Sequence, residues 1–215
     1  MKKLILFDLD GTLIDPYDAI TKSLQYALED AGIEAADRSQ LKVFIGPPLR
    51  TSLREFYNIT DNDEIERIYS KYLEYFSEHG IYENKLYPGV IEMLEELTTT
   101  GAVLTIATSK LMVSARKIAK LLSIDRYFEH IIGCERDGSR SQKSEIIKYI
   151  LDKMGHGYDP VMVGDRKYDI AGAKEIGIDN IGVTWGYGSR EELEEAGAVQ
   201  IADSLEELLR LLTKA

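Results

Sequence analysis

Residues 4–12 read Leu4-Ile5-Leu6-Phe7-Asp8-Leu9-Asp10-Gly11-Thr12, an apolar run that ends in two aspartates two positions apart. A short continuous apolar run is typical of a strand that is buried on both faces of a sheet. Residues two apart in an extended chain point the same way, so Asp8 and Asp10 should converge at the carboxyl end of this strand. Two close carboxylates repel each other, which suggests a shared proton or a bound cation. The alternative is that these residues, with Gly11, form only a turn at the end of a strand.

The same apolar pattern recurs along the chain. Five further short runs read as buried strands, at residues 103–107, 130–133, 161–163, 180–183 and 199–201. Segments with helical periodicity cover residues 90–97, 113–122, 146–154 and 170–176, and a packing helix is expected over 204–212. Strands that alternate with helices predict an α/β fold with a Rossmann-like parallel sheet, covered by helices on both faces. Open sheets of this kind bind ligands at the carboxyl ends of their strands.

Residues 16–85 break this alternation. Two helical stripes of apolar side chains lie within them, over residues 17–31 and 65–76, with no convincing strand between the two. The sequence therefore predicts a helical insert at 16–85, placed directly after the first strand. The α/β core is then formed by residues 1–15 and 86–215.

The composition limits the partners of the chain. Its 215 residues carry a formal net charge of -11, which disfavours nucleic acid or an anionic membrane as the main partner. The single cysteine, Cys134, excludes an intramolecular disulfide. The apolar run near the start is too short for a signal peptide, and no stretch is long enough to span a membrane. We expect a cytoplasmic protein, by default a monomer, that acts on a small molecule.

Two further strand ends carry residues suited to phosphate. Thr108 and Ser109 follow the run 103–107, and a hydroxyl with free amides at a helix start binds phosphate oxygens. A plain helix N-cap is the alternative for this pair. Lys143 opens the helical segment 144–154, where a cation opposes the helix dipole. A nearby phosphate would explain its position, and a solvated surface lysine is the alternative.

A last strand end adds two carboxylates. Asp165 follows the run 160–163, and Asp169 lies four residues later, inside the next helix. The alternative is an acidic pair that only complements the helix dipole. If Asp165 lies beside Asp8 and Asp10, the three residues form an oxygen-ligand site. A few carboxylates, completed by waters and a substrate phosphate, are the ligands expected of Mg²⁺.

These motifs in this order resemble the haloacid dehalogenase-like hydrolase superfamily, specifically its phosphoglycolate-phosphatase-like and 5'-nucleotidase-like branch. The motifs are Asp8-Leu9-Asp10-Gly11-Thr12, Thr108-Ser109, Lys143, and Gly164-Asp165 with Asp169. The resemblance implies that the helical insert is a mobile cap. Within the insert, Ile45-Gly46-Pro47-Pro48-Leu49-Arg50 resembles the cap loop that faces the active site, which makes Gly46 and Arg50 candidate substrate ligands.

The resemblance also assigns chemical roles to the first motif. Asp8 would attack phosphorus and form an aspartyl-phosphate, one of the carboxylate routes of covalent catalysis. Asp10 would protonate the leaving oxygen and then accept a proton from the attacking water. Mg²⁺ would bridge Asp8, Asp165 and the phosphate, and Asp10 would contribute its main-chain carbonyl as a further ligand. Asp169 would hold a metal-bound water or orient Lys143.

The remaining candidates would neutralise the substrate. Thr108, the Ser109 amide and Lys143 would contact the phosphoryl oxygens. Lys110 and Arg50 would each meet a second anionic group, although each is also a plausible solvent-facing cation.

Three functions remain open at this stage. The first is Mg²⁺-dependent hydrolysis of a small phosphomonoester, with 5'-nucleotidase and phosphoglycolate phosphatase as the two named possibilities. The second is a sugar-phosphate mutase, which would also keep the aspartate at position 10. The third is a non-catalytic binding protein with the same fold, because a fold does not by itself fix a function.

Overall fold

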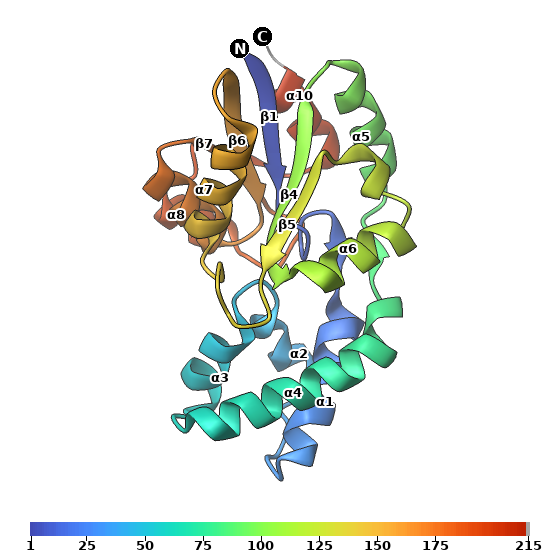
Figure 1. Cartoon of the computed structure of the whole chain (residues 1–215), viewed down its shortest axis with the longest axis vertical. Helices are drawn as coiled ribbons and strands as arrows, with labels where there is room; N and C mark the ends of the chain where they lie inside the picture. Colours follow the sequence, from blue (N-terminus) through green and yellow to red (C-terminus); the bar gives the residue numbers. More distant parts are fainter. Residues whose placement is uncertain (214–215) are drawn as a thin grey trace. The chain divides into compact units, whose positions relative to one another are not determined.

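A computed structural model of the chain describes residues 1–213. The chain forms two compact units, Met1–Asp15 with Leu86–Ala215 and Pro16–Lys85 (Figure 1). The first unit contains the main sheet, and the second is helical.

The main sheet has six parallel strands in the order β5-β4-β1-β6-β7-β8. They are β1 (Lys2–Phe7), β4 (Val103–Leu111), β5 (His130–Cys134), β6 (Tyr158–Gly164), β7 (Asp179–Val183) and β8 (Gln200–Ala202). All six match runs that the sequence singles out, so the predicted α/β fold with a parallel sheet is confirmed. Phe7 pairs with Ile106 of β4 on one side and with Val163 of β6 on the other. Phe7 is therefore level with Ile106 and Val163, and β4 continues beyond this level to Leu111.

Helices cover both faces of this sheet. They are α5 (Val90–Thr99), α6 (Met112–Leu121), the 3₁₀ helix η3 (Asp125–Tyr127), α7 (Lys143–Met154), α8 (Lys167–Ile176), α9 (Arg190–Ala196) and α10 (Leu205–Thr213). On one face, Leu4 and Leu6 pack with Ile146 and Ile150 of α7 and Ala173 of α8 in a fully buried cluster.

On the opposite face, Phe7 meets Phe128 edge to face, with ring centroids 6.4 Å apart. Successive side chains of a strand alternate between faces, so β1 contributes to both cores. It is therefore buried throughout its apolar run, as the sequence predicts for a central strand.

A tight turn follows β1. Gly11 has a φ of 82°, in the left-handed region that glycine adopts without a steric penalty. The main-chain N–H of Gly11 donates to the carbonyl of Ile14 at 2.8 Å, and the N–H of Leu13 donates to the carbonyl of Leu9. Two short strands, β2 (Ile14–Asp15) and β3 (Lys85–Leu86), then form a separate two-stranded sheet at the two boundaries between the units.

The helical unit has its own core. Its elements are α1 (Tyr17–Asp30), α2 (Arg38–Leu41), the 3₁₀ helices η1 (Lys42–Phe44) and η2 (Gly80–Tyr82), α3 (Leu49–Tyr57) and α4 (Asn62–Glu78). Leu24 and Leu28 of α1, Leu53 of α3, and Ile65 and Ile68 of α4 form one buried cluster. Residues 16–84 contain no strand. The stripe predicted over 17–31 covers α1 and the residue after it, and the stripe over 65–76 lies within α4.

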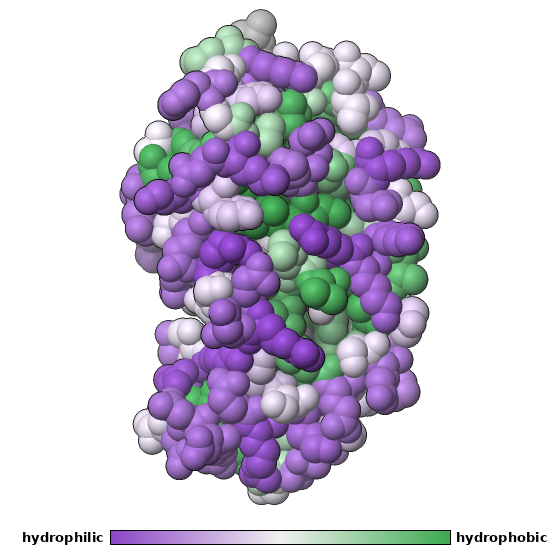
Figure 2. All heavy atoms as spheres, viewed as in Figure 1, coloured by the Kyte–Doolittle hydropathy of each residue, from purple (hydrophilic) through white to green (hydrophobic). Residues whose placement is uncertain are grey.

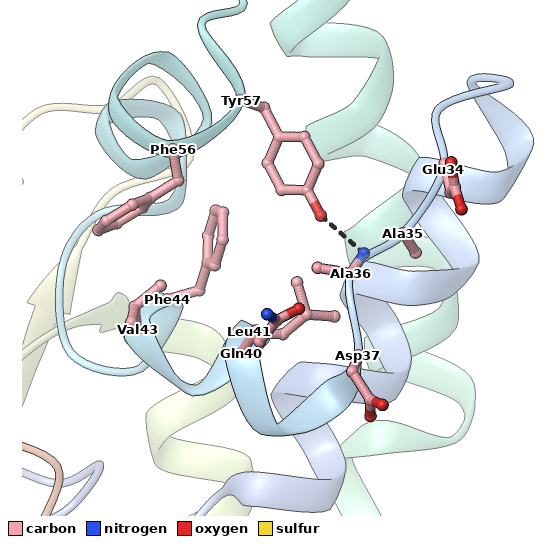
Figure 3. A pocket seen from close by; sticks show the side chains of 10 residues that line it. All are labelled: Glu34, Ala35, Ala36, Asp37, Gln40, Leu41, Val43, Phe44, Phe56 and Tyr57. Atoms are coloured by element: carbon pink, nitrogen blue, oxygen red, sulfur yellow. Dashed lines mark hydrogen bonds between the residues drawn. The ribbon is translucent and has the colours of Figure 1, made fainter.

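A pocket lies within the helical unit, between the segment after α1, η1 and the end of α3 (Figure 3). Phe44 lies 5.2 Å from Phe56 and 5.9 Å from Tyr57, measured between ring centroids. The Tyr57 hydroxyl accepts a hydrogen bond from the main-chain N–H of Ala36 at 3.1 Å. The pocket lining includes none of the residues that the sequence singles out for chemistry.

The surface matches the charged composition of the chain. Hydrophilic residues cover most of the face shown in Figure 2, with smaller apolar areas between them. Among residues 1–213, no helix combines the length and the apolar character that crossing a bilayer requires.

Candidate active site

Three carboxylates meet at the carboxyl edge of the main sheet. Asp8 follows β1, Asp165 follows β6 and Asp169 lies in the first turn of α8. One oxygen from each lies within 4.8 Å of the others, and all three residues are buried. The strand register causes this, because the N–H of Asp8 donates to the carbonyl of Val163 at 2.8 Å and so holds the ends of β1 and β6 together.

The carboxylates fit only because two residues packed against them, Gly164 and Gly186, have no side chain. A Cβ atom at Gly164 would lie 2.1 Å from Cγ of Asp169. A Cβ atom at Gly186 would lie 2.4 Å from Cβ of Asp165. Both distances are far below van der Waals contact, so larger residues at positions 164 and 186 would displace the carboxylates.

Lys143 supplies positive charge to this cluster. It is the first residue of α7, and its Nζ lies 3.0 Å from Oδ1 of Asp8 and 2.7 Å from Oδ1 of Asp169. The same Nζ donates to the carbonyl of Ala107, at the end of the apolar part of β4, at 2.9 Å. The Lys143 side chain is 3% exposed, so the alternative of a solvated surface lysine is excluded.

The electrostatics of the cluster favour a divalent cation. Burial, with repulsion from Asp169 and Asp8, raises the pKa of Asp165 well above its usual value. Burial also raises the pKa of Asp169 to about 6, although Lys143 opposes that rise. Three buried carboxylates share one ammonium, which leaves an uncompensated negative charge of two when all are ionised. Hard oxygen donors with this charge suit Mg²⁺.

Asp165 is held in position from both sides. Its Oδ1 accepts from the Thr12 hydroxyl at 3.1 Å, and its Oδ2 accepts from the main-chain N–H of Tyr187 at 2.8 Å. Trp185 Nε1 donates to the carbonyl of Thr12 at 3.1 Å and links the same loop to the turn after β1.

The sequence patterns did not predict a role for the loop Trp185-Gly186-Tyr187, which contacts Asp165. A signal was present, since this loop follows β7 and so starts at the same edge of the sheet as Asp8 and Asp165. The alternation of aromatic and glycine residues from Trp185 to Gly188 could have indicated a close approach to another segment.

Asp10 lies outside the group of three and pairs with Lys110. Lys110 Nζ donates to Oδ2 of Asp10 at 2.7 Å, and the two side chains are 7% and 9% exposed. Burial raises the pKa of Asp10, and Lys110 opposes this rise. The metal contact that the family resemblance predicts for Asp10 would use its main-chain carbonyl and does not need the carboxyl group in the cluster, so this contact stays a prediction.

Thr108 and Ser109 do not open a helix, which corrects the sequence prediction. Strand β4 continues to Leu111, and α6 begins at Met112. The extension forms because Thr108 pairs with Gly133 and Leu111 with Cys134, with a shift in register between the two pairs. Thr108 is buried and directly follows Ala107, whose carbonyl binds Lys143. Contacts of Thr108 and Ser109 with phosphate stay predictions.

Arg50 and Gly46 lie in the helical unit. Arg50 donates to both carboxylate oxygens of Glu66, at 2.5 and 2.8 Å, and its guanidinium lies 3.8 Å from the ring centroid of Tyr69. Gly46 lies in the connection between η1 and α3 and has a φ of 106°. The contacts of both residues with substrate stay predictions.

Comparison with known proteins identifies a matching family and several relatives. The family model described as haloacid dehalogenase-like hydrolase matches residues 5–183. A 5'-nucleotidase of Pseudomonas aeruginosa is 44% identical over 88% of this chain and 86% of its own length. The tyrosine-protein kinase PtkA of Mycobacterium tuberculosis is 33% identical over 98% of this chain and 72% of its own.

Two further matches support the same assignment. A phosphoglycolate phosphatase of Agrobacterium fabrum is 28% identical over 87% of this chain and 82% of its own length. The crystal structure of a predicted phosphatase from Clostridium acetobutylicum superimposes with a TM-score of 0.95 and 40% identity, covering 99% of this chain and 98% of the other.

Proposed function

The chain belongs to the haloacid dehalogenase-like hydrolase family and is a phosphatase of that family, and we propose that it uses Asp8 and Mg²⁺ to hydrolyse a small phosphomonoester. One observation carries this proposal. Asp8 lies buried with Lys143, Asp165 and Asp169, so a nucleophile, a cation and two further oxygen ligands meet at one edge of the sheet.

Asp8 is the nucleophile in this proposal. The N–H of Leu9 donates to Asp8 Oδ1 at 2.8 Å, and Lys143 Nζ lies 3.0 Å from the same oxygen. These two contacts fix the orientation of the carboxylate before substrate arrives. A carboxylate that is already oriented loses little freedom in the reaction, which lowers the barrier to attack on phosphorus.

The residues present fit a resident Mg²⁺. Asp8, Asp165 and Asp169 would hold it, with the main-chain carbonyl of Asp10 as a further ligand by resemblance to the family. When bound, it would neutralise part of the phosphate charge and align the phosphorus with Asp8. Thr12 and Tyr187 would keep Asp165 in place for this purpose.

Asp10 would transfer the protons. In the first step, the P–O bond to the leaving group breaks as Asp8 bonds to phosphorus, and the Asp10 proton passes to the leaving oxygen. In the second step, water attacks phosphorus, gives a proton to Asp10 and releases Asp8. The raised pKa of Asp10 favours the protonated form that the first step needs.

Lys143, Thr108 and the Ser109 amide would stabilise the transferring phosphoryl group. Phosphoryl transfer depends mostly on positioning and on charge stabilisation, and a buried ammonium acts strongly because little water screens it. The Lys143 ammonium already contacts the nucleophile, so it can reach the oxygens of a phosphate bound there.

The substrate is a small phosphorylated metabolite, and a nucleoside 5'-monophosphate is the first candidate. The 44% identical relative is a 5'-nucleotidase, and phosphoglycolate is the second candidate from the more distant relative. Residues 16–85 would act as a cap that closes over the substrate and excludes water. Gly46 and Arg50 would be the other ligands of the substrate, whereas the ion pair of Lys110 with Asp10 does not favour the substrate contact expected for Lys110. We propose a cytoplasmic monomer that uses neither nucleic acid nor a membrane.

Phosphate release from a panel of monoesters tests this proposal. The panel contains nucleoside 5'-monophosphates, phosphoglycolate, sugar phosphates and an aryl phosphate, each with Mg²⁺ or with a chelator. We expect Mg²⁺-dependent release that Asp8→Asn lowers by at least about 1,000-fold. Asp152→Asn, at an exposed position of α7, is the matched control and should retain full activity.

The outcomes separate the competing functions. Release that survives in Asp8→Asn would exclude Asp8 as the nucleophile. Isomerisation of a sugar phosphate without phosphate release would indicate a mutase. If no ester on the panel reacts, hydrolysis of these phosphomonoesters is excluded and a binding role gains support.

A further inference from the structure

The ion pair between Lys110 and Asp10 is almost inaccessible to solvent. The Nζ–Oδ2 distance is 2.7 Å, and both side chains are less than a tenth exposed. A buried ion pair forms only when its geometry repays the loss of hydration. The pair therefore requires that the backbone around Lys110 be held in a specific conformation.

The extension of β4 supplies this conformation. Lys110 lies two residues beyond Thr108, where the pairing with β5 changes register. The N–H of Lys110 donates to the Thr108 hydroxyl at 3.2 Å. On the other side, a Cβ atom at Gly133 would lie 2.4 Å from the carbonyl oxygen of Lys110, so only glycine fits there. The strand irregularity thus fixes the backbone from which the Lys110 side chain reaches Asp10.

The pair makes the two carboxyl oxygens of Asp10 unequal. Lys110 occupies Oδ2, whereas Oδ1 is buried and has no hydrogen-bond partner among the described residues. An unpartnered buried oxygen is costly unless something else binds it. The leaving oxygen of a substrate, or the attacking water, is a partner of the right chemistry.

We propose that Lys110 is a positioning residue that engages Oδ2 of Asp10 and thereby leaves Oδ1 as the oxygen that transfers the proton. This inference rests on the proposed function, since it assigns an atom within the same reaction. As the ester P–O bond breaks, the proton on Oδ1 passes to the leaving oxygen and an alcohol departs. In the second step a water proton returns to Oδ1, the hydroxide bonds to phosphorus, and the bond from phosphorus to Asp8 breaks.

The alternative role of Lys110, contact with an anionic group of the substrate, makes a different prediction. To contact the substrate, the Lys110 ammonium would have to leave Asp10. The Asp10 carboxylate would then be buried without its partner, which costs a large amount of free energy. Such a contact would also affect every substrate that carries the anionic group, whatever its leaving oxygen. A positioning role affects only the esters whose leaving group needs a proton.

The leaving-group dependence of kcat/KM distinguishes these roles, because kcat/KM reports only the steps through departure of the leaving group. The first substrate is an alkyl phosphate, whose alkoxide leaves poorly. The second is 2,4-dinitrophenyl phosphate, whose dinitrophenolate leaves without protonation. We expect Lys110→Met to lower kcat/KM about 100-fold for the alkyl ester, within the range for general acid catalysis, and less than about 3-fold for the aryl ester. Lys110→Arg should restore part of the loss, and Lys120→Met, at an exposed position of α6, should behave as wild type.

Crystal structures of Lys110→Met and Lys110→Arg provide a readout independent of turnover. The Asp10 carboxyl group should rotate in Lys110→Met and keep its orientation in Lys110→Arg. An equal loss on both esters, no loss on either, or an unmoved Asp10 in Lys110→Met would each overturn the proposal. If the wild type hydrolyses neither ester, the proposed function fails, and the orientation of Asp10 in the two variants still decides whether Lys110 positions it.

Discussion

Replacing Asp165 by asparagine tests the repulsion within the carboxylate cluster. The oxygens of Asp8, Asp165 and Asp169 lie within 4.8 Å of one another, and Asp165 is fully buried. Two unit charges at that distance repel by about 3 kcal/mol at an effective dielectric constant of about 20. Lys143 offsets part of this repulsion, and protonation relieves another part because the pKa of Asp165 is raised.

The asparagine side chain can keep the neighbouring hydrogen bonds. Its carbonyl can accept from the N–H of Tyr187, and its amide can donate to the Thr12 hydroxyl, where the carboxylate now accepts. We therefore expect Asp165→Asn to raise the free energy of unfolding of the metal-free protein by about 1–3 kcal/mol. For a chain of this length that corresponds to a rise in melting temperature of about 3–10 °C.

Thermal unfolding followed by circular dichroism, in a chelator and across a Mg²⁺ titration, is the assay. Mg²⁺ at 100 times its dissociation constant should stabilise the wild type by about 2.7 kcal/mol, and Asp165→Asn should lose most of this response. Asp152→Asn should show the wild-type response. A variant that melts no higher than the wild type in chelator refutes the repulsion argument. A full Mg²⁺ response in Asp165→Asn excludes this residue as a metal ligand.

Three further predictions follow from the same contacts. Gly164→Ala places a Cβ atom 2.1 Å from Cγ of Asp169, so it should cost about 1–3 kcal/mol of stability in denaturant unfolding and lower kcat. Gly155→Ala is the control for kcat, which should stay unchanged because a Cβ atom there meets nothing within 4 Å. Glu66→Gln weakens a partly exposed pair with Arg50 and should change the stability by less than about 1 kcal/mol, so a loss above 2 kcal/mol would contradict a surface role for the pair. The pKa of Asp169 is raised from 3.8 to about 6 in the folded state. Between those pH values the folded state therefore binds more protons than the unfolded state, so the metal-free protein should lose stability as the pH rises from about 4 to 6. Melting temperatures in chelator should show this slope, Asp169→Asn should reduce it, and an unchanged slope in that variant would assign it to other groups.

The sequence predicts the parallel sheet well because its strands are short apolar runs separated by helical periodicity. The strand ends also indicate that Asp8 and Asp165 meet, because parallel strands share a carboxyl edge. The resemblance to the hydrolase family, rather than the local pattern, predicts that Lys143 and Asp169 join them.

Contacts that depend on register could not be predicted in this way. Lys110 and Asp10 are 100 positions apart, and they meet only because β4 continues past Thr108 with an irregularity opposite Gly133. The polar residues of that extension look like the start of a helix, which explains why the sequence wrongly predicts that Thr108 and Ser109 open one; their contact with phosphate stays a prediction. The pairing of Arg50 with Glu66 likewise depends on how α3 packs against α4.

The central place of β1 in the sheet affects how the chain folds during synthesis. Among the strands of this sheet β1 is synthesised first, but its partners are β4 and β6, and β6 ends at Gly164. Thr12 and Asp165 are 153 positions apart, so the site closes only through contacts of very high sequence separation. Such contacts form slowly because the loop-closure entropy must be lost first. Until β6 has been synthesised, β1 is therefore an apolar strand with at least one edge unpaired, a form prone to aggregation.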